Sequence, residues 1–433
     1  MKKLYQLLPV LMFTLSAVAQ KSPGAKAERM ETRILALGKI GANPQGGVSR
    51  VAFSEADKQG RAYIIGLMQA AKLEVRIDEA GNIIGKRPGK NPSLPVIAFG
   101  SHIDSVPFGG NYDGDVGVIG AIECIELLNE QAIVTEHSLE VIVFTDEEGG
   151  LTGSSAMTGE LTPVFLEQIS NSGKTIAQGI TELGGNIEKL KNAVRQKGEL
   201  LAFLELHIEQ GAVLYNGKTN IGIVEGIVGI DSWRVVVEGK ANHAGTTPMN
   251  LRQDALLAAS KFVIAVNESV KSVPGTQVGT IGTIKINPGA SNVIPGKAEM
   301  SLELRSLTRD KILAVFEKIK TRALLIEKQT GTHISYPYSS SNPGAPTDKR
   351  IQNMMAIISG KSGFTYKLMP SGAGHDTQKM SLIAPTGMIF VPSKDGISHS
   401  PDEFTSAQDM ANGASVLLNT ILELDKIINQ SGF

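Results

Sequence analysis

Five side chains able to bind a metal ion lie in glycine-rich stretches of the sequence. They are His102, Asp113, Glu148, His207 and His399. Histidine and carboxylate together suit Zn²⁺ and related divalent ions. Two ions about 3.5–4 Å apart need a ligand that spans the gap, which a carboxylate does and an imidazole does not. We therefore predict two divalent ions bridged by Asp113, with Zn²⁺ as the expected metal and Mn²⁺, Co²⁺ or Ni²⁺ as alternatives.

The adjacent acidic residues Glu147 and Glu148 are predicted to have different roles. Consecutive side chains point apart in an extended or turning backbone, so one carboxylate can bind metal while the other faces a substrate. A carboxylate beside an activated water can take its proton and pass it to a leaving nitrogen. Glu147 is the predicted general base and acid, and Glu148 the metal ligand. Asp104 is predicted to accept the second N–H of the His102 imidazole.

Each of these residues has an ordinary structural explanation when taken alone. A histidine at the end of a strand is usually structural, and a Glu-Glu pair usually lies on a solvated surface. The prediction of a metal site depends on the occurrence of all these residues together in this order. The chain has 42 Lys+Arg against 43 Asp+Glu, so it has no basic field for nucleic acid. Its single cysteine, Cys124, excludes an intramolecular disulfide framework and a Cys-rich zinc site.

The segments that precede these residues are typical of an α/β fold. Short apolar runs predict strands, and they lie at 95–99, 139–144, 201–206 and 387–391. Residues 116–128 have apolar side chains at helical spacing, which gives a strand–helix–strand order. Polar residues follow the strands, at the ends where ligand sites of open α/β sheets form. We expect a mixed sheet flanked by helices.

A second, smaller domain is predicted within the first. Residues 225–338 have a β-α-β-β-α pattern, with strands at 233–237, 278–286 and 298–304 and helices at 251–266 and 309–328. Residues 339–346 are rich in Ser, Asn, Pro and Gly and are the predicted return linker. The large domain is therefore expected in two parts, 26–224 and 339–433.

The first nineteen residues have the pattern of a cleaved secretory signal. Two lysines follow Met1, an apolar run extends to Val18, and the segment ends in Ala-Val-Ala. We expect a mature chain that starts near Gln20 and works in the periplasm or outside the cell. No cysteine follows the run, and no later segment is apolar enough to span a bilayer, so no membrane anchor is expected.

Seven short runs, in order, resemble those of one enzyme family. They are GSHIDS (100–105), GGNYDG (109–114), EEG (147–149), ELHIEQG (205–211), ANHAGTTPM (241–249), SGAGHD (371–376) and ISHSP (397–401). The chain resembles the M20-type binuclear metallohydrolases, in the branch of N-carbamoyl-L-amino-acid hydrolases, allantoate amidohydrolases and β-ureidopropionases. The resemblance covers nearly the whole mature chain.

The resemblance implies a zinc-peptidase-like catalytic domain and an inserted lid that forms a homodimer. It implies the five metal ligands named above, with Glu147 as base and His243 reaching the partner's site to stabilise an oxyanion. It also implies a small ureido or carbamoyl substrate with a carboxylate, held by Gln210, Asn292, Arg305 and His375. The chain departs from the family at Leu151-Thr152, where Arg-Phe is usual, and at Thr377, where a small apolar residue is commoner.

The expected activity is hydrolysis of an N-carbamoyl-amino acid or ureido acid, which releases ammonia and CO₂. Two alternatives stay open. Related enzymes with this metal core are aminoacylases and peptidases, which cut amide and peptide bonds. The second alternative is an exported binding protein that kept the fold and lost catalysis. Such a protein would be expected to lack some of the ligands, yet all five ligands and the base are present.

Overall fold

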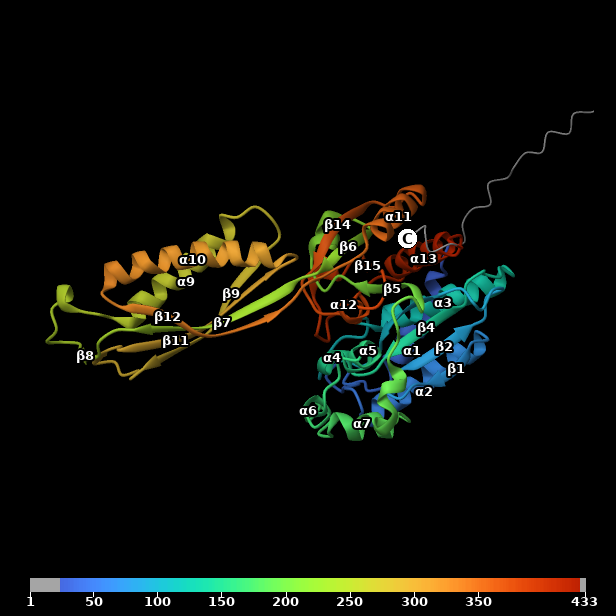
Figure 1. Cartoon of the computed structure of the whole chain (residues 1–433), viewed down its shortest axis with the longest axis horizontal. Helices are drawn as coiled ribbons and strands as arrows, with labels where there is room; N and C mark the ends of the chain where they lie inside the picture. The colour runs from blue at the N-terminus through green and yellow to red at the C-terminus, as the bar shows by residue number, and fades with distance from the viewer. Residues whose placement is uncertain (1–23, 429–433) are drawn as a thin grey trace, which may run out of the picture.

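The computed structural model describes residues 24–428, so the predicted signal at 1–19 lies outside the described residues. Figure 1 shows two parts, a broad catalytic domain and a narrower inserted domain that extends from one side of it. Within residues 24–428 no helix combines the length and the apolar character needed to cross a membrane.

The catalytic domain contains a nine-stranded mixed sheet in the order β1-β2-β4-β3-β5-β15-β6-β13, with β14 paired to β6. The strands are β1 (Glu74–Ile77), β2 (Ile83–Arg87), β3 (Val96–His102), β4 (Leu139–Phe144), β5 (Leu200–Ile208), β6 (Ile221–Ile227), β13 (Ala345–Pro346), β14 (Tyr366–Ser371) and β15 (Thr386–Val391). The central strands β4, β3, β5 and β15 are parallel, so their carboxyl ends lie at one edge of the sheet.

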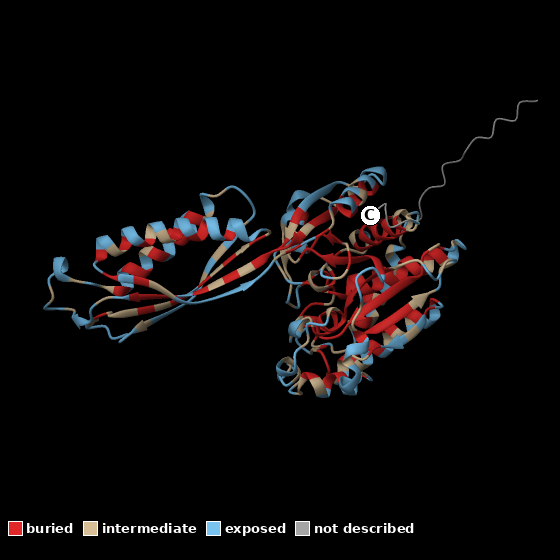
Figure 2. Cartoon of the chain, in the orientation of Figure 1, coloured by how far each residue is buried: buried red, intermediate tan, exposed pale blue. Residues whose placement is uncertain are grey.

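Helices cover both faces of this sheet. One face packs against the apolar sides of α1 (Ala27–Leu37), α2 (Glu55–Ala70), α3 (Asp115–Glu130), α11 (Lys349–Lys361) and α13 (Ala407–Leu424). The other face packs against α5 (Thr152–Thr158) and α12 (Asp376–Met380). The sheet and the inner sides of its helices are the most buried part of the chain, as Figure 2 shows. This double cover explains why β4, β5 and β15 are buried along their whole length instead of alternating between buried and exposed residues.

Short helices connect the strands of the catalytic domain. They are α4 (Glu147–Gly150), α6 (Pro163–Leu166), α7 (Ile176–Glu182), α8 (Val213–Gly217), η1 (Ile187–Ala193) and η3 (Lys394–Gly396). The helix α4 follows β4 directly, which places the Glu147-Glu148 pair at the carboxyl edge of the sheet.

The inserted domain has a four-stranded antiparallel sheet in the order β12-β7-β11-β9. Its strands are β7 (Gly229–Glu238), β9 (Val278–Asn287), β11 (Lys297–Ser306) and β12 (His333–Asn342). The helices α9 (Ala255–Lys271) and α10 (Arg309–Thr330) pack on one face, where Trp233 stacks on Phe316 with ring centroids 4.0 Å apart. A separate pair, β8 (Asn242–His243) and β10 (Val293–Ile294), lies at the end farthest from the catalytic domain (Figure 1), near the short helix η2 (Met249–Leu251).

The predicted fold class is confirmed, whereas the predicted return linker is wrong in part. The sheet of the inserted domain begins at Gly229 and ends at Asn342, against predicted limits of 225 and 338. Residues Ser339–Asn342, assigned to the linker, pair with β7 as the last part of β12. Their polar side chains are exposed on an edge strand, so strand pairing here needs no apolar pattern.

Candidate metal and catalytic centre

Parallel strands bring the predicted ligands to one edge of the sheet. His102 is the last residue of β3, His207 lies near the end of β5, and His399 follows β15. Asp113 comes from the loop before α3, and Glu148 from α4. The geometry gathers the five residues into two groups that share one carboxylate: His102, Asp113 and His207 form one group, and Asp113, Glu148 and His399 the other.

Asp113 lies between the two groups and directs one oxygen at each. Its Oδ1 is 3.5 Å from Nε2 of His102 and 3.0 Å from Nε2 of His207. Its Oδ2 is 3.4 Å from Nε2 of His399, and that nitrogen is 3.5 Å from Oε1 of Glu148. A carboxylate with this arrangement suits the bridging role between two cations.

The chemistry of these donors fits metal ions. Nε2 of His102 is buried and has no hydrogen-bond partner among the described residues. Leaving a buried polar atom without a partner costs free energy, and a cation bound there would remove this cost. Burial opposes ionisation of Asp113, but the surrounding histidines, His207 first, hold its pKa well below the usual value. A hydrogen bond to the same carboxylate raises the pKa of His399 to about 9. The ligand set of histidines and carboxylates suits Zn²⁺ and similar divalent ions.

A glycine next to Asp113 lets the chain pass close to the first histidine. Gly114 has a φ of +67°, and a Cβ there would lie 2.5 Å from Cε1 of His102. A side chain at this position would therefore displace the imidazole as well as strain the backbone. The Gly-rich context of the sequence thus has a direct role in the centre.

Asp104 is placed differently from its predicted role. Nδ1 of His102 is 3.0 Å from the backbone oxygen of Asp104 and 3.7 Å from its Oδ1, so the carbonyl, not the carboxylate, is its nearer partner. The carboxylate instead accepts the backbone N–H groups of Glu147 and Glu148 at 3.2 Å and 3.1 Å. The reason is that α4 starts opposite the end of β3 and presents two unpaired amides to it. Asp104 thereby positions both acidic residues.

The two glutamates lie in an acidic environment. Oε2 of Glu147 is 3.7 Å from Nε2 of His102. Burial raises the pKa of Glu147 well above the usual value, His102 opposes this, and the negative charges of Asp376 and Glu148 add to it. Burial, followed by the charge of Asp113, raises the pKa of Glu148 to about 7. Crowded carboxylates of this kind are stabilised by bound cations.

Sequence reasoning missed Glu403, a buried residue that connects two ligand loops. Its Oε1 accepts the backbone N–H groups of Tyr112 and Asp113 at 2.9 Å and 3.0 Å. Its Oε2 accepts the hydroxyl of Ser398 at 2.8 Å and the N–H of His399 at 3.3 Å. One side chain therefore fixes the loop of Asp113 and the loop of His399 relative to each other. The only signal in the sequence was its position four residues after His399.

Replacing Glu403 with alanine is expected to weaken metal binding by about 10–100-fold, because supporting residues of metal sites have effects of this size. Four hydrogen bonds would be lost at once, so both ligand loops would gain freedom. Competitive chelator titration measures the Zn²⁺ affinity. Asp402→Ala is the matched control, since Asp402 is exposed and adjacent. Wild-type Zn²⁺ affinity in Glu403→Ala would contradict the role.

Glu205 is a second residue without a predicted role. It is fully buried on β5, two residues before His207. Its Oε1 accepts the hydroxyl of Ser101 at 2.8 Å, and its Oε2 accepts the N–H and the hydroxyl of Thr377 at 3.0 Å and 2.6 Å. The hydroxyl of Thr377, the residue that departs from the family pattern, therefore secures the start of α12. This places the ring of His375 4.5 Å from that of His207.

Of the other residues with predicted substrate roles, Gln210 contacts Asp113 and Arg305 contacts the loop before His375. Gln210 donates from Nε2 to Oδ2 of Asp113 at 2.6 Å, which leaves its Oε1 buried and without a partner among the described residues. Arg305 donates from Nη1 to the carbonyl of Gly372 at 2.8 Å and from Nε to Glu303 at 2.7 Å. Gly372 precedes His375 by three residues, so β11 meets the catalytic domain close to the centre.

His243 and Asn292 are not brought to the centre of their own chain. Both are exposed, on or beside the β8–β10 pair at the far end of the inserted domain (Figure 1). Among residues 24–428, neither side chain has a hydrogen bond or ion pair with a metal ligand. Nδ1 of His243 accepts the backbone N–H groups of Gly245 and Thr246 at 3.0 Å and 3.2 Å. Because Nδ1 is an acceptor, the neutral ring carries its proton on Nε2, which is free to donate.

At the departure Leu151-Thr152, the second residue is hydrogen-bonded to the residue that precedes the glutamate pair. Leu151 has a φ of +58°, and Thr152 donates its hydroxyl to Oδ2 of Asp146 at 2.5 Å. Thr152 is fully buried. The chain therefore uses a short hydrogen-bonding side chain where the family usually has a large aromatic one.

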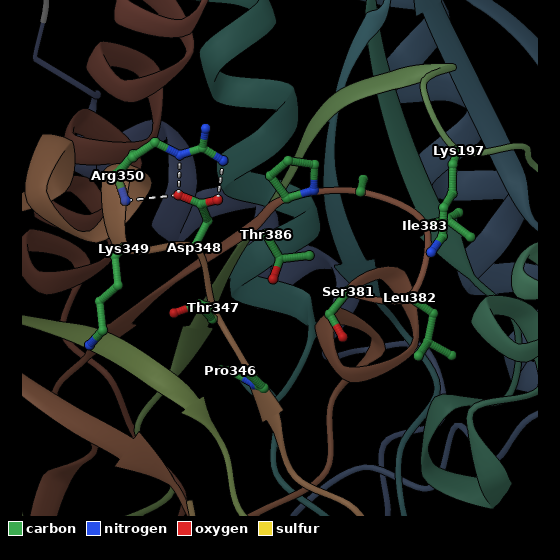
Figure 3. Close-up of a pocket in the computed structure, with 12 residues that line it drawn as sticks. Lys197, Pro346, Thr347, Asp348, Lys349, Arg350, Ser381, Leu382, Ile383 and Thr386 are labelled. Atoms are coloured by element: carbon green, nitrogen blue, oxygen red, sulfur yellow. Dashed lines mark hydrogen bonds and ion pairs between the residues drawn. The ribbon is translucent and has the colours of Figure 1, made fainter. Parts of the chain in front are cut away.

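A cavity of about 600 Å³ lies elsewhere, at the amino end of β15. Figure 3 shows its lining, with Leu382 on one side and Asp348 bound to the guanidinium of Arg350 on the other. None of the predicted site residues lines it. The ligands lie at the opposite, carboxyl ends of the parallel strands, so this cavity is separate from the centre.

Comparisons with known proteins show which family and which solved structures the chain is similar to. The profile of peptidase family M20/M25/M40 matches residues 98–423. The chain is 38% identical over 416 residues to an N-carbamoyl-L-amino acid amidohydrolase of Geobacillus stearothermophilus. The match covers 92% of this chain and 98% of that protein. It is 38% identical over 402 residues to a ureidoglycolate hydrolase of Oryza sativa subsp. japonica, with 90% and 83% covered. A crystal structure of a hydantoinase/carbamoylase family amidase from Burkholderia multivorans matches with a TM-score of 0.84 and 31% identity, over 93% and 98% of the two chains.

Proposed function

Because the chain belongs to the M20 family, and within it to the hydantoinase/carbamoylase amidohydrolases, we propose that it hydrolyses the carbamoyl group of an N-carbamoyl-L-amino acid or a related ureido acid. The chain is a metal-dependent amidohydrolase. The observation that carries the proposal is the Asp113 carboxylate shared between two ligand groups, with Gln210 beside it.

Two divalent ions are proposed, one on each side of Asp113. His102 and His207 would hold one ion together with Asp113, and His399 and Glu148 would hold the other together with the same residue. Ions bound there supply Lewis acidity, which lowers the pKa of water and polarises a carbonyl group. Zn²⁺ is the proposed metal, with Mn²⁺, Co²⁺ and Ni²⁺ as alternatives that the same donors accept.

The free acceptor on Gln210 favours a carbamoyl group over a simple acyl group. Its amide nitrogen is committed to Asp113, so its Oε1 accepts from the substrate. The carbonyl carbon of a ureido group bears two nitrogens, so one N–H group remains beside the bond that is cleaved. The carbonyl carbon of an acyl group bears only the nitrogen of the scissile amide and has no second N–H donor. Arg305 provides a planar guanidinium suited to the substrate's carboxylate. His375 is buried with an unpartnered Nδ1, a second position for a substrate hydrogen bond.

In the proposed reaction, Glu147 accepts a proton from the attacking water as its oxygen bonds to the carbamoyl carbon. The proton then passes from Glu147 to the departing nitrogen as the C–N bond breaks. Nε2–H of the partner's His243 donates to the carbonyl oxygen as negative charge develops on it. The products of this step are the amino acid and carbamic acid, and carbamic acid then breaks down to CO₂ and ammonia.

The proposal is tested with enzyme stripped by chelator and reloaded with one metal at a time. Stripped enzyme is expected to lose activity, and Zn²⁺ or another divalent ion to restore it. The substrates are N-carbamoyl-L-amino acids, allantoate, ureidoglycolate, N-acetyl-amino acids and dipeptides, with ammonia or amine release measured. Exclusive cleavage of dipeptides or N-acetyl-amino acids would replace the proposal by the peptidase or aminoacylase alternative.

A homodimer is proposed because His243, the proposed oxyanion donor, lies on β8 at the far end of the inserted domain (Figure 1). His243 is far from its own metal ligands, and a second copy supplies it in the proposed assembly. Apolar side chains are exposed on α9, namely Leu257 and Ile264, and on α10, namely Leu324 and Leu325. Exposed apolar patches of this kind are typical of subunit interfaces.

Export is proposed from the first nineteen residues alone. Sequencing of the amino terminus of protein recovered outside the cytoplasm is expected to start near Gln20. Retention of Met1 in the recovered protein would contradict the proposal.

A further inference from the structure

A second cavity, of about 450 Å³, borders the metal centre. Its lining comes from the start of α8, from β14 and the loop after it, and from the inserted domain at Thr276. The volume is in the range of ordinary small-molecule sites. We call it the β14 pocket.

The β14 pocket lies between the two points that hold the ends of the proposed substrate. At one end is Gln210, whose amide contacts the bridging carboxylate of Asp113. At the other end is Gly372, whose carbonyl accepts from Arg305. A substrate with its carbamoyl group at Asp113 and its carboxylate at Arg305 has its α-carbon between them. The substituent on that carbon then faces the pocket.

The wall of the β14 pocket is largely apolar. Val213, Leu368, Met369 and Pro370 contribute hydrocarbon surface. Glu209 is also part of the lining, but its carboxylate is committed to the backbone N–H groups of α8, which it accepts at 2.8 Å. An apolar substituent therefore gains by leaving water here.

The charged residues of the pocket disfavour an acidic substituent. Lys367 is one cation, whereas Glu209 and Glu225 are two anions. An acidic side chain would meet an excess of negative charge, and a polar one would find few free partners on the hydrocarbon wall.

We propose that the β14 pocket is the side-chain subsite and that it selects N-carbamoyl-L-amino acids with bulky apolar side chains, such as those of leucine, methionine and phenylalanine. This inference rests on the proposed function. The inference adds to the proposed function which carbamoyl compounds are preferred and which residues select them.

The test compares kcat/KM for N-carbamoyl derivatives of glycine, alanine, leucine, phenylalanine and glutamate, and for ureidoglycolate, with the metal-loaded enzyme. Leucine and phenylalanine derivatives are expected to exceed the glycine derivative by about tenfold or more. Leu368→Glu is expected to remove most of this preference, because it should lower kcat/KM for the leucine and phenylalanine derivatives more than for the glycine derivative. Val213→Trp, which narrows the pocket, is expected to reduce kcat/KM for phenylalanine most.

Leu382→Glu is the matched control. Leu382 is 47% exposed in the separate cavity of Figure 3, and Leu368 is 45% exposed, so both changes place a charge at a similar surface position. The control should keep the wild-type preference. Circular dichroism of each variant confirms that it is folded.

The outcomes separate this inference from the proposed function. Hydrolysis of all carbamoyl substrates with no preference for bulky apolar ones, or a preference for glutamate or ureidoglycolate, overturns the subsite alone. An unchanged preference in both Leu368→Glu and Val213→Trp also overturns it. Failure to hydrolyse any carbamoyl or ureido substrate, glycine included, overturns both.

Discussion

Glu147→Gln is expected to bind metal ions with wild-type stoichiometry and to lose about 10²–10⁴-fold in kcat, the usual size of general acid–base catalysis. The amide has nearly the same shape as the carboxyl group but accepts no proton. The backbone N–H of residue 147 still bonds to Asp104, so the start of α4 should keep its position. Elemental analysis and steady-state kinetics on the same preparation measure both quantities.

The neighbouring residue gives the control for this prediction. Glu148→Gln removes a charged ligand from the His399 side of Asp113, so it should lower the metal content as well as the rate. Excess Zn²⁺ should recover activity in Glu148→Gln and none in Glu147→Gln. A Glu147→Gln enzyme with wild-type kcat would remove Glu147 from the mechanism, and one without metal would make it a ligand.

Most of the catalytic domain was predictable because its signals are local. Apolar runs too short for helices, each followed by a polar residue, predicted β3, β4, β5 and β15 and the edge where their carboxyl ends meet. Parallel strands of this kind fix which polar residues become neighbours. The grouping of His102, Asp113 and His207 follows from that topology, and Gly114 shows why the loop between them needs glycine.

The residues that support the centre were not predictable in the same way. Glu403 acts on Tyr112 and Asp113, which lie almost 300 residues away in the sequence. The Asp104 carboxylate bonds to amides of α4, and such contacts leave no spacing pattern in a single sequence. Both depend on which loops meet in space. The β12 residues Ser339–Asn342 were missed for another reason, because an exposed edge strand has no apolar pattern to detect.

His243→Ala is expected to keep its fold and metal content and to lose about 10²–10³-fold in kcat, as for the loss of one oxyanion donor. The residue is exposed and forms only local hydrogen bonds, so little stability depends on its ring. If the donor comes from the partner, two inactive variants should complement each other. A mixed dimer of His243→Ala and Glu147→Gln has one site with both changes and one site with neither.

Co-expression in equal amounts makes half of the dimers mixed, so the preparation should have about a quarter of the wild-type activity. The control is a mixture of Glu147→Gln with Glu148→Gln, assayed without added Zn²⁺. Each site of that mixed dimer keeps one defect, so no activity should return. Recovery in the first mixture alone requires that each centre takes groups from two chains. This agrees with the position of β8 at the end of the inserted domain farthest from the catalytic domain (Figure 1). Equal, negligible activity in both mixtures would mean that His243 acts within its own chain. The exposed faces of α9 and α10 would then need another explanation.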